Sequence, residues 1–195
     1  MTYQNLNIRP ATQNDAEDLV RLIIIAGDGL PLDLWESMRE AGETVFDVGV
    51  RRAKRETGGF SYTNALIADI DGMPVAAAIA YRLPDHVESF DPASMPYHLV
   101  PLQELENLVA GTWYINVLTT YETFRGRGIG QSLLKHIDTL AKQAGCSQAS
   151  IITSDLNPAL RLYQREGFFE LERRKVLKPT YTRSDNEWIV LAKSL

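Results

Sequence analysis

The segment Trp113–Ile137 constrains the fold more than any other part of this chain, because it joins an apolar strand to an amphipathic helix through a glycine-rich turn. Apolar side chains alternate from Trp113 to Leu118, which is typical of a buried strand. From Ile129 onward the apolar residues recur at helical spacing. The sequence therefore predicts a strand, a tight turn and a helix in immediate succession.

The turn has the sequence RGRGIG at residues 125–130. The first turn of a helix leaves backbone N–H groups without intrahelical partners, and the helix dipole places partial positive charge there. Glycine has no Cβ, so a bulky anion can approach the backbone closely. Arg125 and Arg127 add charge-assisted donors at the same place. The segment therefore predicts a binding site for a diphosphate.

Other glycine-rich motifs fit this turn less well. A dinucleotide-binding G-x-G-x-x-G motif would need a glycine where the chain has Leu133, and a Walker A loop would need a lysine in place of Gln131. Arg-Gly dipeptides also occur in disordered tails that bind nucleic acid, but here they are flanked by regular structure in a chain of net charge −5. A purely structural turn stays open as the alternative.

A second segment lies downstream of this motif. Gln148–Thr153 is predicted to be a buried strand, and Ala159 to Phe168 match the pattern A-x-x-L-Y-x-x-x-G-F. Together with R-x-x-G-x-G between a strand and a helix, this arrangement resembles the GNAT superfamily of N-acetyltransferases and its acetyl-coenzyme A signature. The resemblance covers nearly the whole chain.

The resemblance implies an α/β (α+β) fold with a mixed, mostly antiparallel central sheet of six to seven strands, flanked by about four to five helices. It also implies one domain over residues 1–195, with its core motif at 113–145. The residue patterns predict strands at 6–9, 62–70, 74–83, 113–118, 148–153, 169–177 and 187–192. They predict helices at 12–26, 31–41, 43–56, from 129 and from about 159, and a helical turn at 99–108.

Acetyl-CoA is the acyl donor that the resemblance implies. The implied cofactor-binding residues are Leu118, Thr119, Thr120, Arg125, Gly126, Arg127, Gly128, Ile129, Gly130, Gln131 and Asn157. By the same resemblance, the backbone N–H groups of Leu118–Thr120 would polarise the thioester carbonyl. Many family members have an asparagine where this chain has Leu156. Asn157 therefore either contacts the pantetheine arm or caps the next helix, with Pro158 at its first position.

Tyr163 occupies the position of the family's usual general acid, and the alternative is a half-buried ring that only packs. The general base is less well defined. Some members carry a glutamate on the strand that corresponds to 148–153, where this chain has none. Glu104 and Glu106, just before the central strand, are the candidate bases, and a chain of water molecules is the alternative.

Two acceptor-side segments, 30–57 and 84–111, are predicted to determine specificity. The first lies where family members build one wall of the acceptor site. The second carries five carboxylates and no lysine or arginine, namely Asp85, Glu88, Asp91, Glu104 and Glu106. It is either a solvated acidic face or an acidic mouth that attracts a cationic amine.

Composition narrows the classes of function. Net negative charge gives no bulk support for nucleic-acid binding. The single cysteine, Cys146, is expected to fill the core, and no metal site is expected. No apolar run approaches a membrane span, so a cytoplasmic protein is expected.

The function expected from these features is acetyl-CoA-dependent N-acetyl transfer to a primary amine of a small molecule or a peptide. A non-catalytic acyl-CoA-binding regulatory module is the main alternative, and an acyltransferase for longer chains is the third. Homodimers are common among related enzymes, and the sequence leaves dimerisation open.

Overall fold

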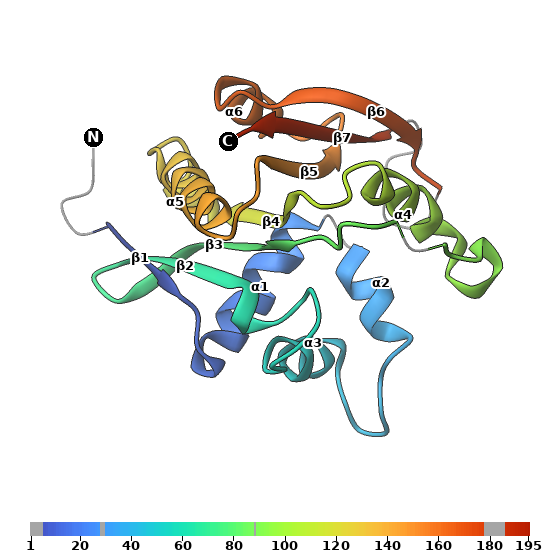
Figure 1. The fold of residues 1–195 in the computed structure, drawn as a ribbon. Coiled ribbons are helices and arrows are strands. Elements are labelled where there is room, and N and C mark those ends of the chain that lie inside the picture. Colours follow the sequence, from blue (N-terminus) through green and yellow to red (C-terminus); the bar gives the residue numbers. More distant parts are fainter. Residues whose placement is uncertain (1–5, 28–29, 88, 178–185) are drawn as a thin grey trace. The chain divides into compact units, whose positions relative to one another are not determined.

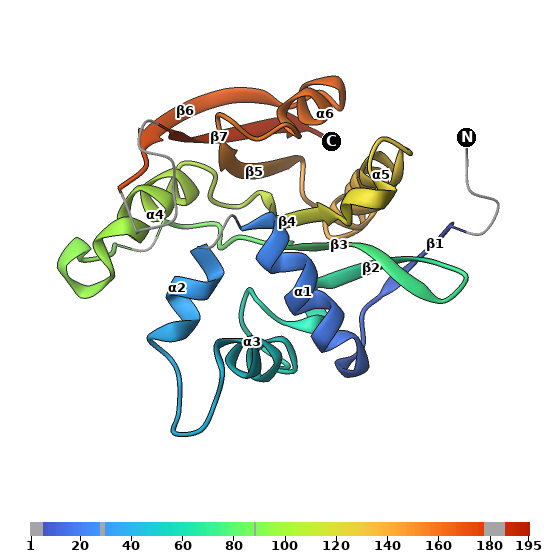
Figure 2. The same ribbon diagram turned by 180° about the vertical axis from the view of Figure 1, so that it is seen from behind.

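The computed structural model describes residues 6–27, 30–87, 89–177 and 186–195, whose path is drawn in Figures 1 and 2. Seven strands form a mostly antiparallel sheet in the order β1-β2-β3-β4-β5-β7-β6. The strands are β1 Leu6–Pro10, β2 Ala65–Ile70, β3 Met73–Arg82, β4 Trp113–Thr120, β5 Gln148–Ser154, β6 Phe169–Lys175 and β7 Glu187–Ser194. This mixed sheet confirms the predicted fold class.

Six α-helices occur in the described residues, one more than the upper number expected. They are α1 Ala16–Ala26, α2 Leu30–Glu36, α3 Val45–Ala53, α4 Val100–Asn107, α5 Ile129–Gln143 and α6 Leu160–Arg165. The excess arises because α4 is a complete helix inside a connection that was expected to add only a helical turn. Within the described ranges, no helix is long and apolar enough to cross a membrane.

Contacts divide the chain into two compact units. Unit 1 comprises Met1–Ala80 and Asn116–His136, and unit 2 comprises Tyr81–Ile115 and Ile137–Leu195. In unit 1, helices α1, α2 and α3 lie together on one side of β1, β2 and β3, and α5 begins on the other side (Figures 1 and 2). Unit 1 therefore carries the glycine-rich turn at the start of α5.

Several predicted boundaries in unit 1 are confirmed and others are wrong. The Asp71-Gly72 turn joins β2 to β3 with both residues at positive φ, as this dipeptide predicts. Residues 62–64 form a 3₁₀ turn instead of the start of a strand, because the Ser61 hydroxyl accepts a hydrogen bond from the Thr63 N–H. Helix α2 ends at Glu36 instead of residue 41. The Ser61 cap decided the first of these boundaries, and apolar spacing alone does not reveal it.

A nearly buried ion-pair network ties β1 to the start of α1. The Arg9 guanidinium contacts both carboxylate oxygens of Asp15, at 2.7 and 2.9 Å, and one oxygen of Asp69 at 3.0 Å. The same Asp15 carboxylate accepts hydrogen bonds from the Thr12 N–H and hydroxyl, so Thr12 and Asp15 form a capping box. These hydrogen bonds, led by that from Arg9, hold the pKa of Asp15 at about 2.

Acid should remove the stability that this network supplies. Because folding lowers the pKa of Asp15, the contribution is present above the unfolded pKa of about 4 and is lost as the pH falls towards 2. We expect Asp15→Asn to lower the free energy of unfolding at pH 7 by about 2 kcal/mol, and this gap to close on acidification. Urea unfolding at pH 7, 5 and 3 measures it. Asp18→Asn, which breaks an exposed pair with Arg21, is the control. A gap that does not depend on pH would contradict the assignment.

Unit 2 is built on the antiparallel strands β5, β7 and β6. Helix α4 packs against β6 and β7, and the core between them contains Leu105, Tyr114 and Val190. Cys146 is buried, as expected for a core residue. Lys193 of β7 is also buried, and its ammonium group lies 2.7 Å from Asp138 of α5. Unit 2 carries the predicted acid Tyr163 and both predicted bases.

Candidate active site

The connection from β4 to α5 forms an open backbone loop. The strand ends where the Tyr121 N–H donates to the Val75 carbonyl, and a 3₁₀ turn then covers Glu122–Phe124. Gly126 and Gly128 follow with φ values of +73° and +82°. Such angles favour glycine, and no atom of the described residues lies within 4 Å of a Cβ built at either position. The backbone of this loop is therefore accessible to a ligand.

The N-terminus of α5 supplies hydrogen-bond donors beside these glycines. Ile129, the first residue of the helix, is buried and anchors this end. The first bond of the helical series runs from the Ser132 N–H to the Gly128 carbonyl. The N–H groups of Ile129 and Gly130 thus belong to the set that a helix leaves without intrahelical partners. A helix of 15 residues also places partial positive charge at this end.

The two arginines of the loop are exposed, and each has a different contact. Arg125 Nε donates to the Thr120 carbonyl at 3.1 Å, which ties the loop to the end of β4. The guanidinium carbon of Arg127 lies 5.4 Å from the centre of the Phe124 ring. Both arginines are exposed and are chain neighbours of the two glycines. This combination of main-chain donors and guanidinium groups suits a diphosphate.

The predicted cofactor residues from Leu118 to Gln131 therefore form one continuous segment of unit 1. Thr119 of β4 is buried, whereas Leu118 and Thr120 are half-buried. Asn157 is the exception, because it belongs to unit 2.

The side chain of Asn157 closes the turn between β5 and α6. Its Oδ1 accepts a hydrogen bond from the Ala159 N–H at 2.9 Å, and its Nδ2 donates to Thr153 Oγ1 at 2.7 Å. The prediction that Asn157 caps a helix starting at Pro158 is wrong, because α6 begins at Leu160. The Asn157 side chain instead caps the turn that precedes α6, and the Leu160 N–H donates to the Asn157 carbonyl in the same turn. The cofactor role of Asn157 stays a prediction.

Tyr163 is held rigidly inside unit 2. Its side chain is 2% exposed, and burial raises its pKa well above the ordinary value. The Phe168 ring meets it edge-on, with centroids 6.1 Å apart, and the Lys193 ammonium lies 4.7 Å from the Phe168 centroid. A phenol with a raised pKa stays protonated at neutral pH, so Tyr163 can act only as a proton donor there. The prediction of a half-buried ring underestimated its burial.

The two candidate bases on α4 have different surroundings. Glu104 forms an ion pair with Arg174 of β6, at 2.9 Å between Oε2 and Nε. Glu106 is half-buried, and this burial raises the pKa of its carboxyl group. Its charge, together with burial, also raises the pKa of the Tyr114 hydroxyl in the core beneath. A carboxylate with a raised pKa is a better proton acceptor at neutral pH, so Glu106 is better suited to accept a proton than Glu104, which Arg174 engages.

Ion pairs neutralise part of the negative charge of the acidic connection 84–111. Asp85 forms an ion pair with Arg82 at 2.6 Å, and Glu104 with Arg174. Asp91 caps a 3₁₀ turn by accepting from the Ala93 N–H, and Glu88 lies outside the described residues. Both arginines lie outside residues 84–111, so a count of charges within the connection overestimates its unpaired negative charge.

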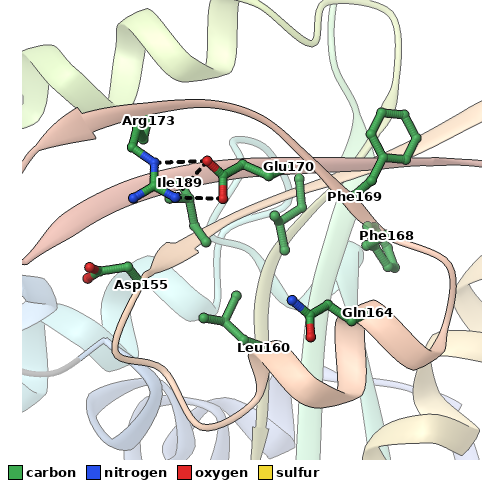
Figure 3. Close-up of a pocket in the computed structure, with 9 residues that line it drawn as sticks. Asp155, Leu160, Gln164, Phe168, Phe169, Glu170, Arg173 and Ile189 are labelled. Atoms are coloured by element: carbon green, nitrogen blue, oxygen red, sulfur yellow. Dashed lines mark hydrogen bonds and ion pairs between the residues drawn. The ribbon is translucent and has the colours of Figure 1, made fainter.

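Unit 2 also has a cavity of about 390 Å³ beside α6, which contains none of the predicted site residues (Figure 3). Its lining includes Leu160, Phe168 and Ile189, with Glu170 and Arg173 paired at the rim. Arg173 is bound on its other side by Glu187 at 2.6 Å. Glu170 and Arg173 are paired with each other here, and the Asp155 carboxylate, which also lines the cavity, accepts a hydrogen bond from the Glu187 N–H at 3.0 Å.

Lys193 was not among the residues predicted from the sequence, and its contact with Phe168 supports the Tyr163 ring. A signal was present, because Lys193 shares a strand face with the apolar Ile189 and Leu191. A lysine on the inward face of a strand is uncommon without a buried partner. That partner, Asp138, lies on a different element and has no local signal.

Residues 33–168 match the model of the acetyltransferase (GNAT) family. A search of curated proteins finds no match. Among solved structures, one described as an acetyltransferase is 21% identical, with a TM-score of 0.65 and coverage of 96% of this chain and 98% of that one. A GNAT family acetyltransferase from Elizabethkingia anophelis with acetyl-CoA bound is 18% identical, with a TM-score of 0.61 and coverage of 98% and 99%. A chain of the NatC complex bound to Gag peptide and CoA is 16% identical, with a TM-score of 0.59 and coverage of 98% and 99%. At these identities the structures show the shared fold.

Proposed function

The chain belongs to the acetyltransferase (GNAT) family, and from that premise we propose that it transfers an acetyl group from acetyl-CoA to a primary amine of a small molecule or a peptide by direct attack. The observation that carries the proposal is the open loop at the start of α5. Gly126 and Gly128 leave their backbone accessible, and Arg125 and Arg127 stand beside it. These groups fit the diphosphate of acetyl-CoA.

Acetyl-CoA, when bound, supplies an acetyl thioester. The chain must then provide a proton acceptor for the incoming amine. An amine with the pKa of lysine is neutral in only about one molecule in 2,500 at pH 7, which costs roughly 4.6 kcal/mol. We assign the role of base to Glu106, because burial raises its pKa towards the working range. Glu104 is a weaker candidate, since Arg174 already binds its carboxylate.

Three further roles complete the proposal. The backbone N–H groups of Leu118–Thr120 polarise the carbonyl oxygen of the thioester. Tyr163 donates a proton from its hydroxyl to the leaving thiolate. Asn157 remains assigned to the pantetheine arm, although its side-chain amide is engaged by Thr153 and Ala159. The whole chain is proposed to act as one catalytic domain.

An assay of CoA release with a panel of primary amines tests this function. We expect release that depends on the amine, and a fall of about a hundredfold in kcat for Glu106→Gln. Since the pKa of Glu106 is raised, kcat should fall on acidification at a pH above the ordinary range of a glutamate.

Glu104→Gln is the matched control on the same helix, and its kcat should change little. Equal losses in both variants would remove the assignment of the base. A protein that binds acetyl-CoA but releases no CoA with any amine would instead be the non-catalytic binding module.

A further inference from the structure

The end of α3 carries a group of cations with unequal surroundings. Arg51 is bound by Glu43 at 2.9 Å and by the Met38 carbonyl at 3.1 Å. Arg55 donates to the carbonyls of Arg52 and Phe60, at 3.2 and 3.1 Å. Cations at a helix C-terminus are favourable because of the helix dipole, so these two need no further explanation.

Arg52, between them, lacks such partners. Its Nε is buried and has no hydrogen-bond partner among the described residues. Its Nη1 meets only the thioether sulfur of Met38, at 3.2 Å, and sulfur is a weak acceptor. Burial and the positive charges of Arg55 and Arg51 lower its pKa. The guanidinium is thus partly desolvated beside two like charges.

Such an arrangement is costly unless something compensates it. A buried donor left without a partner destabilises the folded protein, and more so when it is charged. Arg51 shows that this surface can supply carboxylates, since Glu43 and Glu40 both lie beside it. Neither carboxylate pairs with Arg52. The planar fork of a guanidinium matches a carboxylate or a phosphate, and such an anion would supply the missing acceptors.

We propose that Arg52, assisted by Arg55, binds an anionic group on the acceptor, so that the acceptor is an amine bearing a carboxylate or a phosphate. The assignment of this anion to the acceptor rests on the proposed function and on the prediction that segment 30–57 lines the acceptor site.

A titration of the wild-type protein with inorganic phosphate tests the binding site directly. The Nε–H resonance of Arg52, assigned by its loss in Arg52→Gln, should shift saturably, whereas that of Arg51 should not. Sodium chloride at equal ionic strength is the control. The same titration with CoA and dephospho-CoA distinguishes an anion on the acceptor from the phosphate of the cofactor. A shift caused by CoA and not by dephospho-CoA would assign the site to the cofactor's phosphate and overturn the acceptor assignment, and no saturable shift with phosphate would overturn the site.

Acetylation of matched amines tests the specificity. We expect kcat/KM to be about tenfold higher for β-alanine than for β-alaninamide, and for aminoethyl phosphate than for ethanolamine. Arg52→Gln should abolish this preference, and Arg51→Gln should keep it. Equal preference in Arg52→Gln and wild type would overturn the proposal. If no amine is acetylated, the proposed function fails, while the phosphate titration still decides whether Arg52 binds an anion.

Discussion

Gly128→Asp should abolish the binding of acetyl-CoA, with affinity falling by more than about a hundredfold. The new carboxylate would stand at the residue before α5, where the diphosphate is expected, and would both repel it and compete for the same N–H donors. The backbone there has a φ of +82°, which adds strain for any side chain. Isothermal titration calorimetry with acetyl-CoA measures the change.

Two control variants separate the effect of the added negative charge from the effect of backbone strain. Gly128→Ala keeps the strain and adds no charge, so its affinity should fall much less. Gly145→Asp adds the same side chain at a φ of +77°, also into open space, but beyond the C-terminal end of α5. Its acetyl-CoA affinity should match that of the wild type. A loss of affinity as large in either control as in Gly128→Asp would remove the loop from the cofactor site.

Tyr163→Phe should lower kcat by about a hundredfold and leave the affinity for acetyl-CoA unchanged. The substitution removes only a hydroxyl from a ring that is 2% exposed, so it creates almost no cavity and the Phe168 contact persists. Because burial raises the pKa of Tyr163, the acid stays protonated well above neutral pH. Loss of this proton should therefore not limit the wild-type rate between pH 7 and 9.

Steady-state kinetics measures kcat, and calorimetry on the same preparation measures the affinity for acetyl-CoA. Tyr62→Phe, in a 3₁₀ turn of unit 1, is the matched control and should keep wild-type kcat. Full activity of Tyr163→Phe across this pH range would show that another group supplies the proton. A fall in acetyl-CoA affinity equal to the fall in kcat would assign the hydroxyl to binding instead.

Local sequence patterns determined most of the fold. The turn at Asp71-Gly72 and the glycines at 126 and 128 adopt the positive φ angles that these residues favour, so the hairpin and the loop before α5 follow from chemistry within a few residues. The amphipathic spacing after Ile129 likewise specifies α5. Such features depend on backbone preference and local periodicity, which a sequence displays directly.

The tertiary structure was needed to establish where helices and strands end and which charged groups are paired. Glu104 pairs with Arg174, 70 residues away, and Lys193 with Asp138, 55 residues away. These pairings made Glu106 the better candidate base and explained how the ring beside Tyr163 is supported. No local pattern encodes them, because a partner at that distance is chosen by the packing of whole elements.

By itself, then, the sequence determined the glycine-rich loop before α5 and the sheet-forming strands, and its family resemblance pointed to the candidate acid. Only the tertiary structure decided which carboxylates are neutralised, how deeply Tyr163 is buried and that Arg52 lacks a counter-ion among the residues that the structure describes. The physical reason is that backbone conformation depends mainly on neighbours in the chain, whereas desolvation and ion pairing depend on neighbours in space.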